Sequence, residues 1–545
     1  MRVPRCIMPY PRDDFKVNGA EGAARGVEGQ VVGALGSIGA ATLASRVLGY
    51  VRDMVVALAF GAGPVTDAFF VAFRIPNILR RLLGEGALST AVVPVFTEYA
   101  ATRPRPAFDR MLRAMLAGAL LALIVTTVLG VVGAPWLVGL VAPGFAGDAA
   151  QFGLAVLLTR VMFPYLVLVG LAALAMGALH SQGRFFAAAL GPAVLNVGMI
   201  AGIVVLATRV DPPILALAIG VLVGGVGQLL VQIPSLRACG LPLTPSRELR
   251  HPALLRVARL LVPAVFGLAA VQVMVFVNTL LASLLPGGAI SFLYYADRVM
   301  EFPLGVFGIA LASASLPAMS RQAAVGDVAG VAATLNFALR LAVFISVPAS
   351  VALVVLRAPI VQILFERGRF GPDDTAATAA ALAWYGIGLV GFAGARIAAQ
   401  SFYAIGQPGV AVRLGVVAVA VNIVAAVSLM APMGHAGLAL ASSIGAWANL
   451  GTLMWMARRR LGPLGGRALA ASAARTAAAS APLAAWCWLA VELTLPARAG
   501  GTLPAAAWLA GVVAGGMVLF WGVAAAVRAP ERATLRRLLP WGRAR

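Results

Sequence analysis

The chain has 545 residues, of which 61% are hydrophobic and only 11% are charged, and its mean hydropathy is +0.93. Soluble domains are about 45–50% apolar and about 25% charged, so this composition excludes a soluble globular protein and indicates an integral membrane protein. The formal net charge of +22 would suggest nucleic-acid binding in a soluble protein. Here the basic residues cluster at the ends of apolar runs, which membrane topology explains better.

Residues 1–29 are polar, rich in glycine and arginine, and contain no apolar core, so they predict a disordered cytoplasmic tail and not a cleaved signal peptide. After this tail come apolar runs that can cross a bilayer, which takes about 20 helical residues. These runs predict an all-α polytopic membrane protein. Breaks at proline, glycine and charged residues divide them into fourteen predicted spans: 33–60, 65–98, 111–141, 150–179, 185–207, 213–236, 255–285, 289–320, 334–356, 374–404, 409–430, 436–457, 470–491 and 503–527.

The basic residues of the connections predict the orientation of the chain. If the N-terminus is cytoplasmic, most of these residues fall on the cytoplasmic side, as the positive-inside rule expects. The asymmetry holds along the whole chain and predicts that both termini are cytoplasmic. The outside connections then hold only Arg209, Arg357, Arg367, Arg369 and Arg498.

The first twelve predicted spans form an internal repeat. A shift of 223 residues pairs identical residues in two distant regions, for example Phe69 with Phe292 and Gly183 with Gly406. It places spans 1–6 over spans 7–12, as in transporters that bind substrate at the interface of parallel repeats. The predicted domains are a cytoplasmic tail over 1–29, six-helix lobes over 30–237 and 238–460, two extra transmembrane helices over 461–528, and a basic cytoplasmic tail over 529–545.

The first two spans carry more internal charge than any other long apolar run. Residues 45–99 read SRVLGYVRDMVVALAFGAGPVTDAFFVAFRIPNILRRLLGEGALSTAVVPVFTEY. A charge inside a bilayer costs from about 3 to more than 10 kcal/mol, so such residues face a protein interior or a watery cavity. The charged side chains of this stretch include Arg46, Arg52, Asp53, Asp67, Arg74, Arg80, Arg81 and Glu85.

The eighth span carries a second charged group, formed by Asp297, Arg298 and Glu301. Under the 223-residue shift Arg74 falls opposite Asp297, so the two repeats present charge at matching depth. Pro303 follows directly and should bend this helix.

Two interpretations of these charges remain open. Helical spacing allows Arg81 to pair with Glu85 and Arg298 with Glu301, and it places Arg46 and Asp53 on one face. Pairing leaves an excess of arginine, however, to which Arg160 and Arg396 add. We favour a cationic cavity for an anionic ligand, because the planar guanidinium group binds phosphate with two hydrogen bonds. Asn196 and Asn422 also lie inside spans, where an amide more often bonds across helices than binds substrate.

Three stretches carry a resemblance to a known family. SRVLGYVRD (45–53) with TDAFFVAFRIPNILRRLLGEGALSTAVVPVFTEY (66–99), LTRVMFPYLVLVGLAALAMGALHSQGRF (158–185) and YYADRVMEFPLGVFG (294–308) resemble the first two, the fourth and the eighth spans of the MurJ (MviN) family. This family comprises bacterial lipid II flippases of the multidrug/oligosaccharidyl-lipid/polysaccharide exporter superfamily. The plan of six, six and two spans is similar.

The resemblance implies a transporter and not an enzyme. It implies that lipid II, an undecaprenyl-diphosphate-linked disaccharide pentapeptide, crosses from the inner to the outer leaflet of the bacterial cytoplasmic membrane for peptidoglycan synthesis. Arg46, Arg52 and Arg298 match the family's substrate-binding arginines, and the last two spans match a groove for the lipid tail. Other cell-wall synthesis proteins are possible partners. Asp53, Asp67, Arg80 and Glu85 match charged positions that the family uses at the substrate site or in gating. We assign Arg74, Arg81, Asp297 and Glu301 to the same charge network.

We expect alternating access without a bound cofactor, because the sequence contains no nucleotide-binding motif and the energy must come from ion gradients, the membrane potential or substrate consumption. The alternatives are a flippase for another polyprenyl-diphosphate-linked oligosaccharide and a multidrug/cation antiporter of the same superfamily. An antiporter for cations should have an acidic or aromatic cavity, which these arginines do not provide. An enzyme acting on polyprenyl phosphates would need acidic metal ligands or a nucleophile–base pair, and an anion channel would leave the repeat unexplained.

Overall fold

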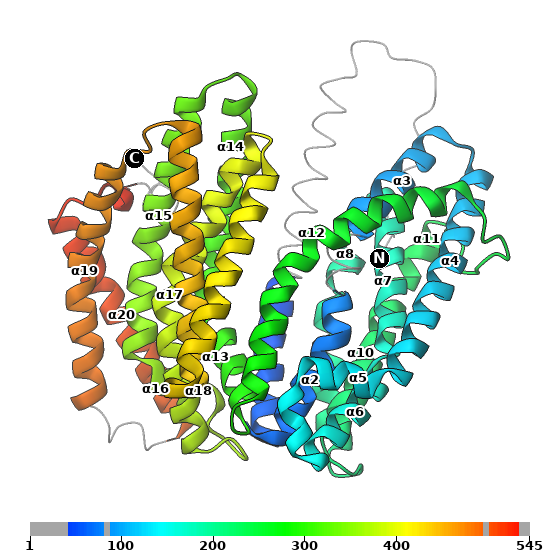
Figure 1. The fold of residues 1–545 in the computed structure, drawn as a ribbon, viewed down its shortest axis with the longest axis horizontal. Helices are drawn as coiled ribbons and strands as arrows, with labels where there is room; N and C mark the ends of the chain where they lie inside the picture. The colour runs from blue at the N-terminus through cyan, green and yellow to red at the C-terminus, as the bar shows by residue number, and fades with distance from the viewer. Residues whose placement is uncertain (1–41, 81–87, 494–500, 534–545) are drawn as a thin grey trace. The chain divides into compact units, whose positions relative to one another are not determined.

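The computed structural model describes residues 42–80, 88–493 and 501–533, and within these ranges the fold is all-helical, with no β-strand (Figure 1). The predicted N-terminal tail and most of the C-terminal tail lie outside the described residues, as do Arg81 and Glu85. Nine of the described helices are long and apolar enough to cross a membrane. The prediction of an all-α membrane protein is confirmed, and the count of fourteen spans stays a prediction.

Internal contacts divide the chain into two compact units. The N-terminal unit contains the described residues up to Phe60 together with Pro64–Phe276, and the C-terminal unit contains Gly61–Gly63 together with the described residues from Val277 onward. The division falls within one long helix, α12 (Pro252–Ser283). The sequence placed the boundary between the two lobes earlier, between residues 237 and 238.

The N-terminal unit begins with a helix over residues 42–60. The helices that follow are α2 (Pro64–Arg80), α3 (Leu88–Thr102), α4 (Arg105–Val132), α5 (Ala134–Val141), the 3-10 turn η3 (Pro143–Gly147), α6 (Ala149–Met162), α7 (Tyr165–Ser181), α8 (Phe186–Ala189), α9 (Gly191–Leu206), α10 (Leu215–Leu230), α11 (Ile233–Ala238) and the first part of α12.

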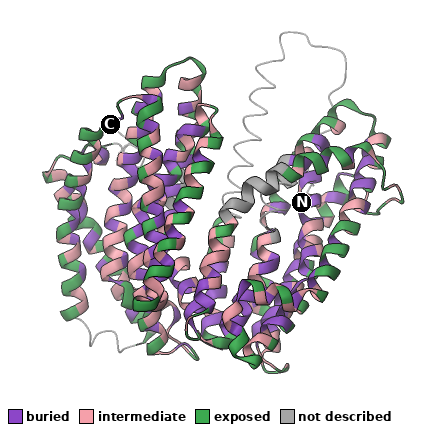
Figure 2. Ribbon diagram, viewed as in Figure 1, coloured by how far each residue is buried: buried purple, intermediate pink, exposed green. Residues whose placement is uncertain are grey.

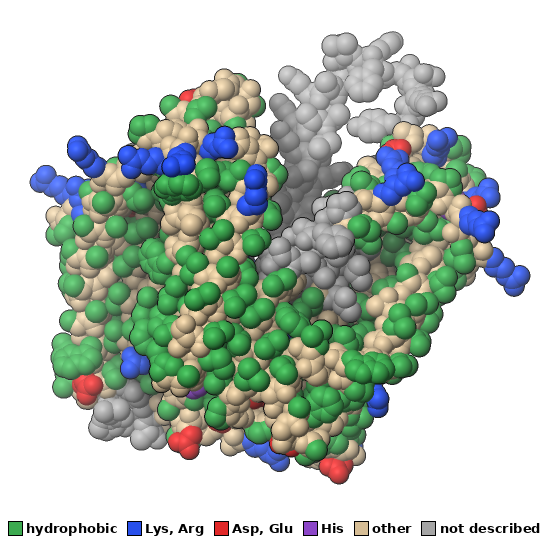
Figure 3. Space-filling view, viewed as in Figure 1, with side chains coloured by type: hydrophobic (Ala, Val, Ile, Leu, Met, Phe, Trp, Pro, Cys, Tyr) green, Lys and Arg blue, Asp and Glu red, His purple; other side chains and the backbone are tan. Residues whose placement is uncertain are grey.

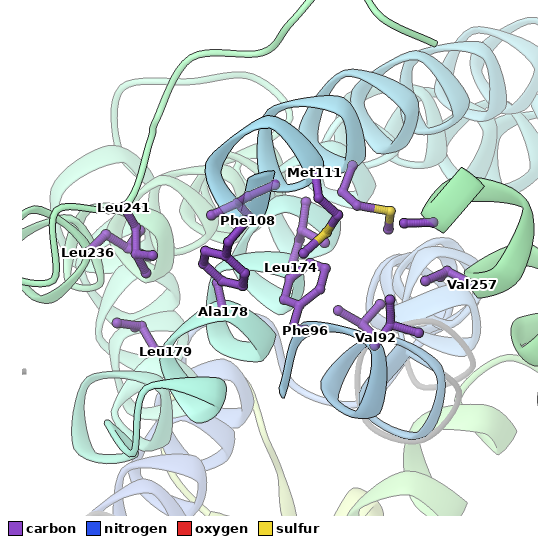
Figure 4. Close-up of a cluster of buried hydrophobic side chains, with 14 of the residues drawn as sticks. Val92, Phe96, Phe108, Met111, Leu174, Ala178, Leu179, Leu236, Leu241 and Val257 are labelled. Atoms are coloured by element: carbon purple, nitrogen blue, oxygen red, sulfur yellow. The ribbon is translucent and has the colours of Figure 1, made fainter. Parts of the chain in front are cut away.

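A cluster of buried apolar side chains joins α3, α4, α7 and the start of α12 in this unit (Figure 4). Phe96 and Phe108 meet edge to face there, with ring centroids 6.4 Å apart, and Met111 and Leu174 are buried beside them. This cluster fixes one end of the unit.

Glycines hold α9 and α10 in backbone contact. A Cβ atom on Gly198 would lie 2.5 Å from the backbone of Gly224, and one on Gly202 would lie 2.5 Å from the carbonyl oxygen of Ala216. Small residues permit this close approach between membrane helices. As a result α9, which carries Asn196, is a closely packed support inside the N-terminal unit.

The C-terminal unit contains the rest of α12 and the remaining helices. These are α13 (Ala289–Pro303), the π-helical turn η4 (Leu304–Gly308), α14 (Ile309–Ala324), α15 (Val328–Val355), α16 (Arg357–Phe365), α17 (Pro372–Ala404), α18 (Pro408–Leu461), α19 (Gly466–Leu493) and α20 (Thr502–Ala526). The helix α18 contains non-helical backbone at Gly434, with φ 58° and ψ −137°. Only glycine adopts this conformation readily. This non-helical residue confirms the predicted break between residues 430 and 436.

The last two helices pack on α15 and on each other. Phe344 of α15 contacts Phe520 of α20, with ring centroids 5.1 Å apart, and the indole of Trp486 in α19 donates a 2.9 Å hydrogen bond to the carbonyl of Val512. Glu531, which follows α20 and is buried, accepts hydrogen bonds from Arg340 Nε at 2.7 Å and from Ser472 Oγ at 2.9 Å. The pair α19–α20 is thus fastened to the C-terminal unit at several points.

The outer faces of the helices are apolar. Leu129, Val204 and Val518 expose 67–72% of their surface, and buried residues lie where helices of the same unit face each other (Figure 2). On the visible surface, hydrophobic side chains cover the middle of each unit and arginines gather near helix ends (Figure 3). An apolar belt with charged ends is what a bilayer requires of a multi-pass protein.

Candidate functional site

The N-terminal charged group centres on Arg52 and Asp53 in the helix over residues 42–60. Both side chains are buried, with 9% of Arg52 and 1% of Asp53 exposed. Asp53 Oδ1 accepts hydrogen bonds from Arg52 Nη2 at 2.7 Å and from Arg52 Nε at 3.0 Å. A charge at this depth must be paired, and this carboxylate supplies a pairing partner along one edge of the guanidinium group.

A third side chain completes this group from another helix. Asn196 of α9 is buried, and its Oδ1 accepts a 3.0 Å hydrogen bond from Arg52 Nη1. Its Nδ2 donates a 3.1 Å hydrogen bond to the carbonyl oxygen of Ser45. The prediction that Asn196 bonds across helices is confirmed, whereas Asn422 has no hydrogen-bond partner for either amide atom among the described residues.

Arg46 follows Ser45 directly and is exposed on the same helix. The sequence placed Arg46 and Asp53 on one helix face. In the structure, however, Asp53 forms its ion pair with the adjacent residue Arg52. The long side chain of Arg52 allows Nη2 to reach the carboxylate of Asp53 while Nη1 contacts Asn196 of α9.

The charged side chains of α2 differ in how far they are buried. Asp67 lies in the first turn of α2 and is buried, where a carboxylate is stabilised by the positive end of the helix dipole. Arg74 is half-buried two turns further along. Arg80 is the last residue of α2, and its side chain is outside the described part, so the predicted pairing of Arg81 with Glu85 remains a prediction.

The C-terminal charged group lies on α13. Arg298 Nη1 and Glu301 Oε2 form a 3.2 Å ion pair, which confirms the pairing predicted from their spacing. Asp297 is half-buried beside them. Glu301 also interacts electrostatically with Arg396 of α17. Arg396 was predicted only to add positive charge, because the sequence does not indicate which residues of other helices lie near it.

Aromatic packing and a helix irregularity frame this group. Tyr295, fully buried on α13, contacts Phe365 and Phe370, with ring centroids 4.9 and 5.5 Å away. Directly after Pro303 the helix becomes the π-helical turn η4. Proline lacks the amide hydrogen that a regular helix needs, and π-turns inside helices are frequent at functional sites. The predicted bend at Pro303 therefore coincides with a local irregularity of the helix backbone.

Each unit thus holds an arginine against a carboxylate of the same helix. In both groups the guanidinium group is paired with an acid of its own helix, Arg52 with Asp53 and Arg298 with Glu301. Such an arginine can exchange its carboxylate for another oxyanion, and phosphate oxygens fit its planar edge with two parallel hydrogen bonds. The chemistry suits an anionic ligand.

Comparison with known proteins gives a consistent result. The model of the family described as "Lipid II flippase MurJ" matches residues 56–506, a range that includes Asp67 and Arg298 and begins after Arg52 and Asp53. A Burkholderia cenocepacia protein named lipid II flippase MurJ is 40% identical over 433 residues, covering 79% of this chain and 84% of its own. A Rhizobium meliloti protein named probable lipid II flippase MurJ is 34% identical over 523 residues, covering 93% and 96%.

Solved structures show the same fold. A structure titled as lipid II flippase MurJ in an inward closed conformation aligns with a TM-score of 0.74 and 24% identity, covering 89% of this chain and 97% of its own. An inward-facing multidrug resistance transporter of the MATE family aligns with a TM-score of 0.62 and 17% identity, covering 77% and 95%.

Proposed function

The chain belongs to the MurJ family of lipid II flippases, and we propose that it moves lipid II from the inner to the outer leaflet of the bacterial cytoplasmic membrane. The protein is a multi-pass membrane transporter of this family. The observation that carries the proposal is the family match, which extends over most of the chain and includes the second charged group, at Arg298.

The charged groups supply chemistry that fits this substrate. The headgroup of lipid II is joined to its prenyl chain by a diphosphate, and we assign its binding to Arg46, Arg52 and Arg298. Asp53 and Glu301 form ion pairs with two of these arginines, Arg52 and Arg298. A diphosphate carries more negative charge than one carboxylate, so it can take their place on the guanidinium edges. Asp67, Arg74, Arg80, Arg81, Glu85 and Asp297 would complete the gating network.

We propose that transport follows alternating access, with the prenyl tail remaining in lipid and the helices α19 and α20 guiding it. Both termini would lie in the cytoplasm. Moving one charge across a potential of 100 mV changes its energy by about 2.3 kcal/mol. An inside-negative potential therefore favours outward movement of the anionic headgroup, and equally the inward return of positive charge on the empty carrier. No cofactor is required by this scheme.

The proposal is tested by depleting the protein from its host and measuring lipid II exposed on the outer leaflet. We expect exposure to fall and lipid-linked wall precursor to accumulate inside. Normal exposure and wall synthesis in a host without a second flippase would refute the proposal, whereas loss of a different lipid-linked oligosaccharide from the outer leaflet would redirect it to that substrate.

A further inference from the structure

Asn196 connects two parts of the first charged helix that lie about two turns apart. Through its oxygen it contacts the guanidinium group of Arg52, and through its nitrogen it contacts the backbone at Ser45, the residue before Arg46. We propose that Asn196 is a positioning residue, which holds Arg52 in the orientation that binds the diphosphate of the headgroup. This inference rests on the proposed function.

The hydrogen bonds fix the orientation of the amide. The oxygen of Asn196 faces a donor on Arg52 and the nitrogen faces an acceptor, the carbonyl oxygen of Ser45. The flipped amide would place its NH2 group against the guanidinium group and its oxygen against the carbonyl oxygen, and both contacts would be repulsive. Only one orientation satisfies both neighbours, so the amide can act as a rigid link between them.

Asp53 and Asn196 differ in charge and in the part of the Arg52 guanidinium group that they contact, and the sulfur of Met199 also lies 3.9 Å from Nη1. Asp53 contacts Nε and Nη2, the edge that a phosphate group would also use, whereas Asn196 contacts Nη1. A phosphate can therefore replace Asp53 while the bond to Asn196 is kept. Because an amide oxygen carries no formal charge, Asn196 orients the guanidinium group without cancelling the charge that attracts the ligand.

The support behind Asn196 is itself firmly packed. Asn196 is 6% exposed, and the turns of α9 that follow it lie against the α10 backbone through Gly198 and Gly202. A positioning residue needs such a support, because an orientation is held only as well as the helix that carries it.

A simpler alternative is that Asn196 only joins two helices, since interhelical hydrogen bonds in membrane proteins contribute modestly to stability. The two roles can be separated with Gln228 of α10 as a matched control. It is also a buried amide of the N-terminal unit, and its Oε1 accepts a 3.3 Å hydrogen bond from Tyr165 Oη on another helix. Gln228→Ala should affect stability without affecting Arg52.

The test measures the affinity of purified full-length protein in lipid nanodiscs for lipid II, together with the thermal midpoint of each variant. Asn196→Ala should weaken binding about tenfold, the effect of one hydrogen bond to a charged group. Asn196→Asp should weaken it further, because a second carboxylate would neutralise Arg52. Asn196→Gln, which keeps the amide, should recover part of the lost affinity, and Gln228→Ala should bind as the wild type does.

The decisive comparison is made in the Arg52→Ala background. If Asn196 acts through Arg52, adding Asn196→Ala to Arg52→Ala should cause no further loss of affinity. An equal loss in both backgrounds, or wild-type affinity for Asn196→Ala, would overturn this inference and leave the proposed function intact. Wild-type protein that does not bind lipid II would overturn the proposed function and this inference with it.

Discussion

Replacing Asp53 with asparagine should change the stability of the protein and its affinity for the headgroup in opposite directions. The substitution keeps the size of the side chain but removes the carboxylate charge that receives two hydrogen bonds from Arg52. Both partners are at least nine-tenths buried as side chains. Breaking a buried ion pair by removing one partner costs about 3–5 kcal/mol. We expect a loss near the lower figure, because Asn196 still bonds to Arg52.

The affinity for lipid II should rise in the same variant. In the wild type the diphosphate has to displace Asp53 from the Nε–Nη2 edge of Arg52, and in Asp53→Asn it displaces a neutral amide. Bound ligand should then restore much of the lost stability, since a ligand at 100 times its Kd stabilises a protein by about 2.7 kcal/mol.

The assay compares thermal unfolding midpoints with and without lipid II, together with direct binding in nanodiscs. Glu248→Gln is the matched control, because Glu248 pairs with Arg110 at an exposed position of the same unit, and exposed pairs contribute little. A folded Asp53→Asn variant with weaker binding would refute the reasoning, since it would mean that Asp53 contacts the substrate directly and does not compete with it.

Three further predictions concern the scaffold. The hydrogen bond from Arg110 lowers the pKa of Glu248. This pair therefore stabilises the protein fully above the ordinary carboxyl pKa of about 4.3, and the stabilisation is lost as the pH falls through the lowered pKa. Unfolding midpoints of the wild type, measured from pH 6 to pH 3, should converge with those of Glu248→Gln at the acid end. Gly202→Val should sharply reduce the yield of folded protein, because its Cβ would collide with the α10 backbone. Gly511→Ala should leave the yield unchanged, because no atom lies within 4 Å of the new Cβ. Equal yields of the two variants by size-exclusion chromatography would contradict the close packing of α9 and α10. Glu531→Ala should lower the unfolding midpoint by leaving a part-buried arginine without its carboxylate, and an unchanged midpoint would show that this contact does not fasten the last helices.

Much of the fold could be predicted because a bilayer constrains sequence strongly. Apolar run lengths indicated an all-α membrane protein, and the break predicted between residues 430 and 436, which contains Pro432 and Gly434, appears as a glycine with positive φ inside α18. The spacing of Arg298 and Glu301 predicted their ion pair, since residues three apart on a helix are neighbours. These are local or compositional signals.

The rest depended on contacts between distant segments. Adjacent residues on a helix point in different directions, so the pair Arg52–Asp53 had no signal in the spacing, and only the long side chain of Arg52 makes it possible. The role of Asn196 depends on where α9 lies, 144 residues from Arg52 in sequence. Nothing in the sequence around Asn196 indicates which helix it meets.

The most direct test of the central claim is the movement of lipid II across vesicles that contain only this protein. With an inside-negative potential, we expect wild-type protein to transfer labelled lipid II to the outer leaflet faster than protein-free vesicles do, and faster than without a potential. Arg52→Ala and Arg298→Ala, inserted at equal density, should transfer it at the protein-free rate. Transfer by the wild type no faster than in protein-free vesicles, or undiminished transfer by both variants, would contradict the account.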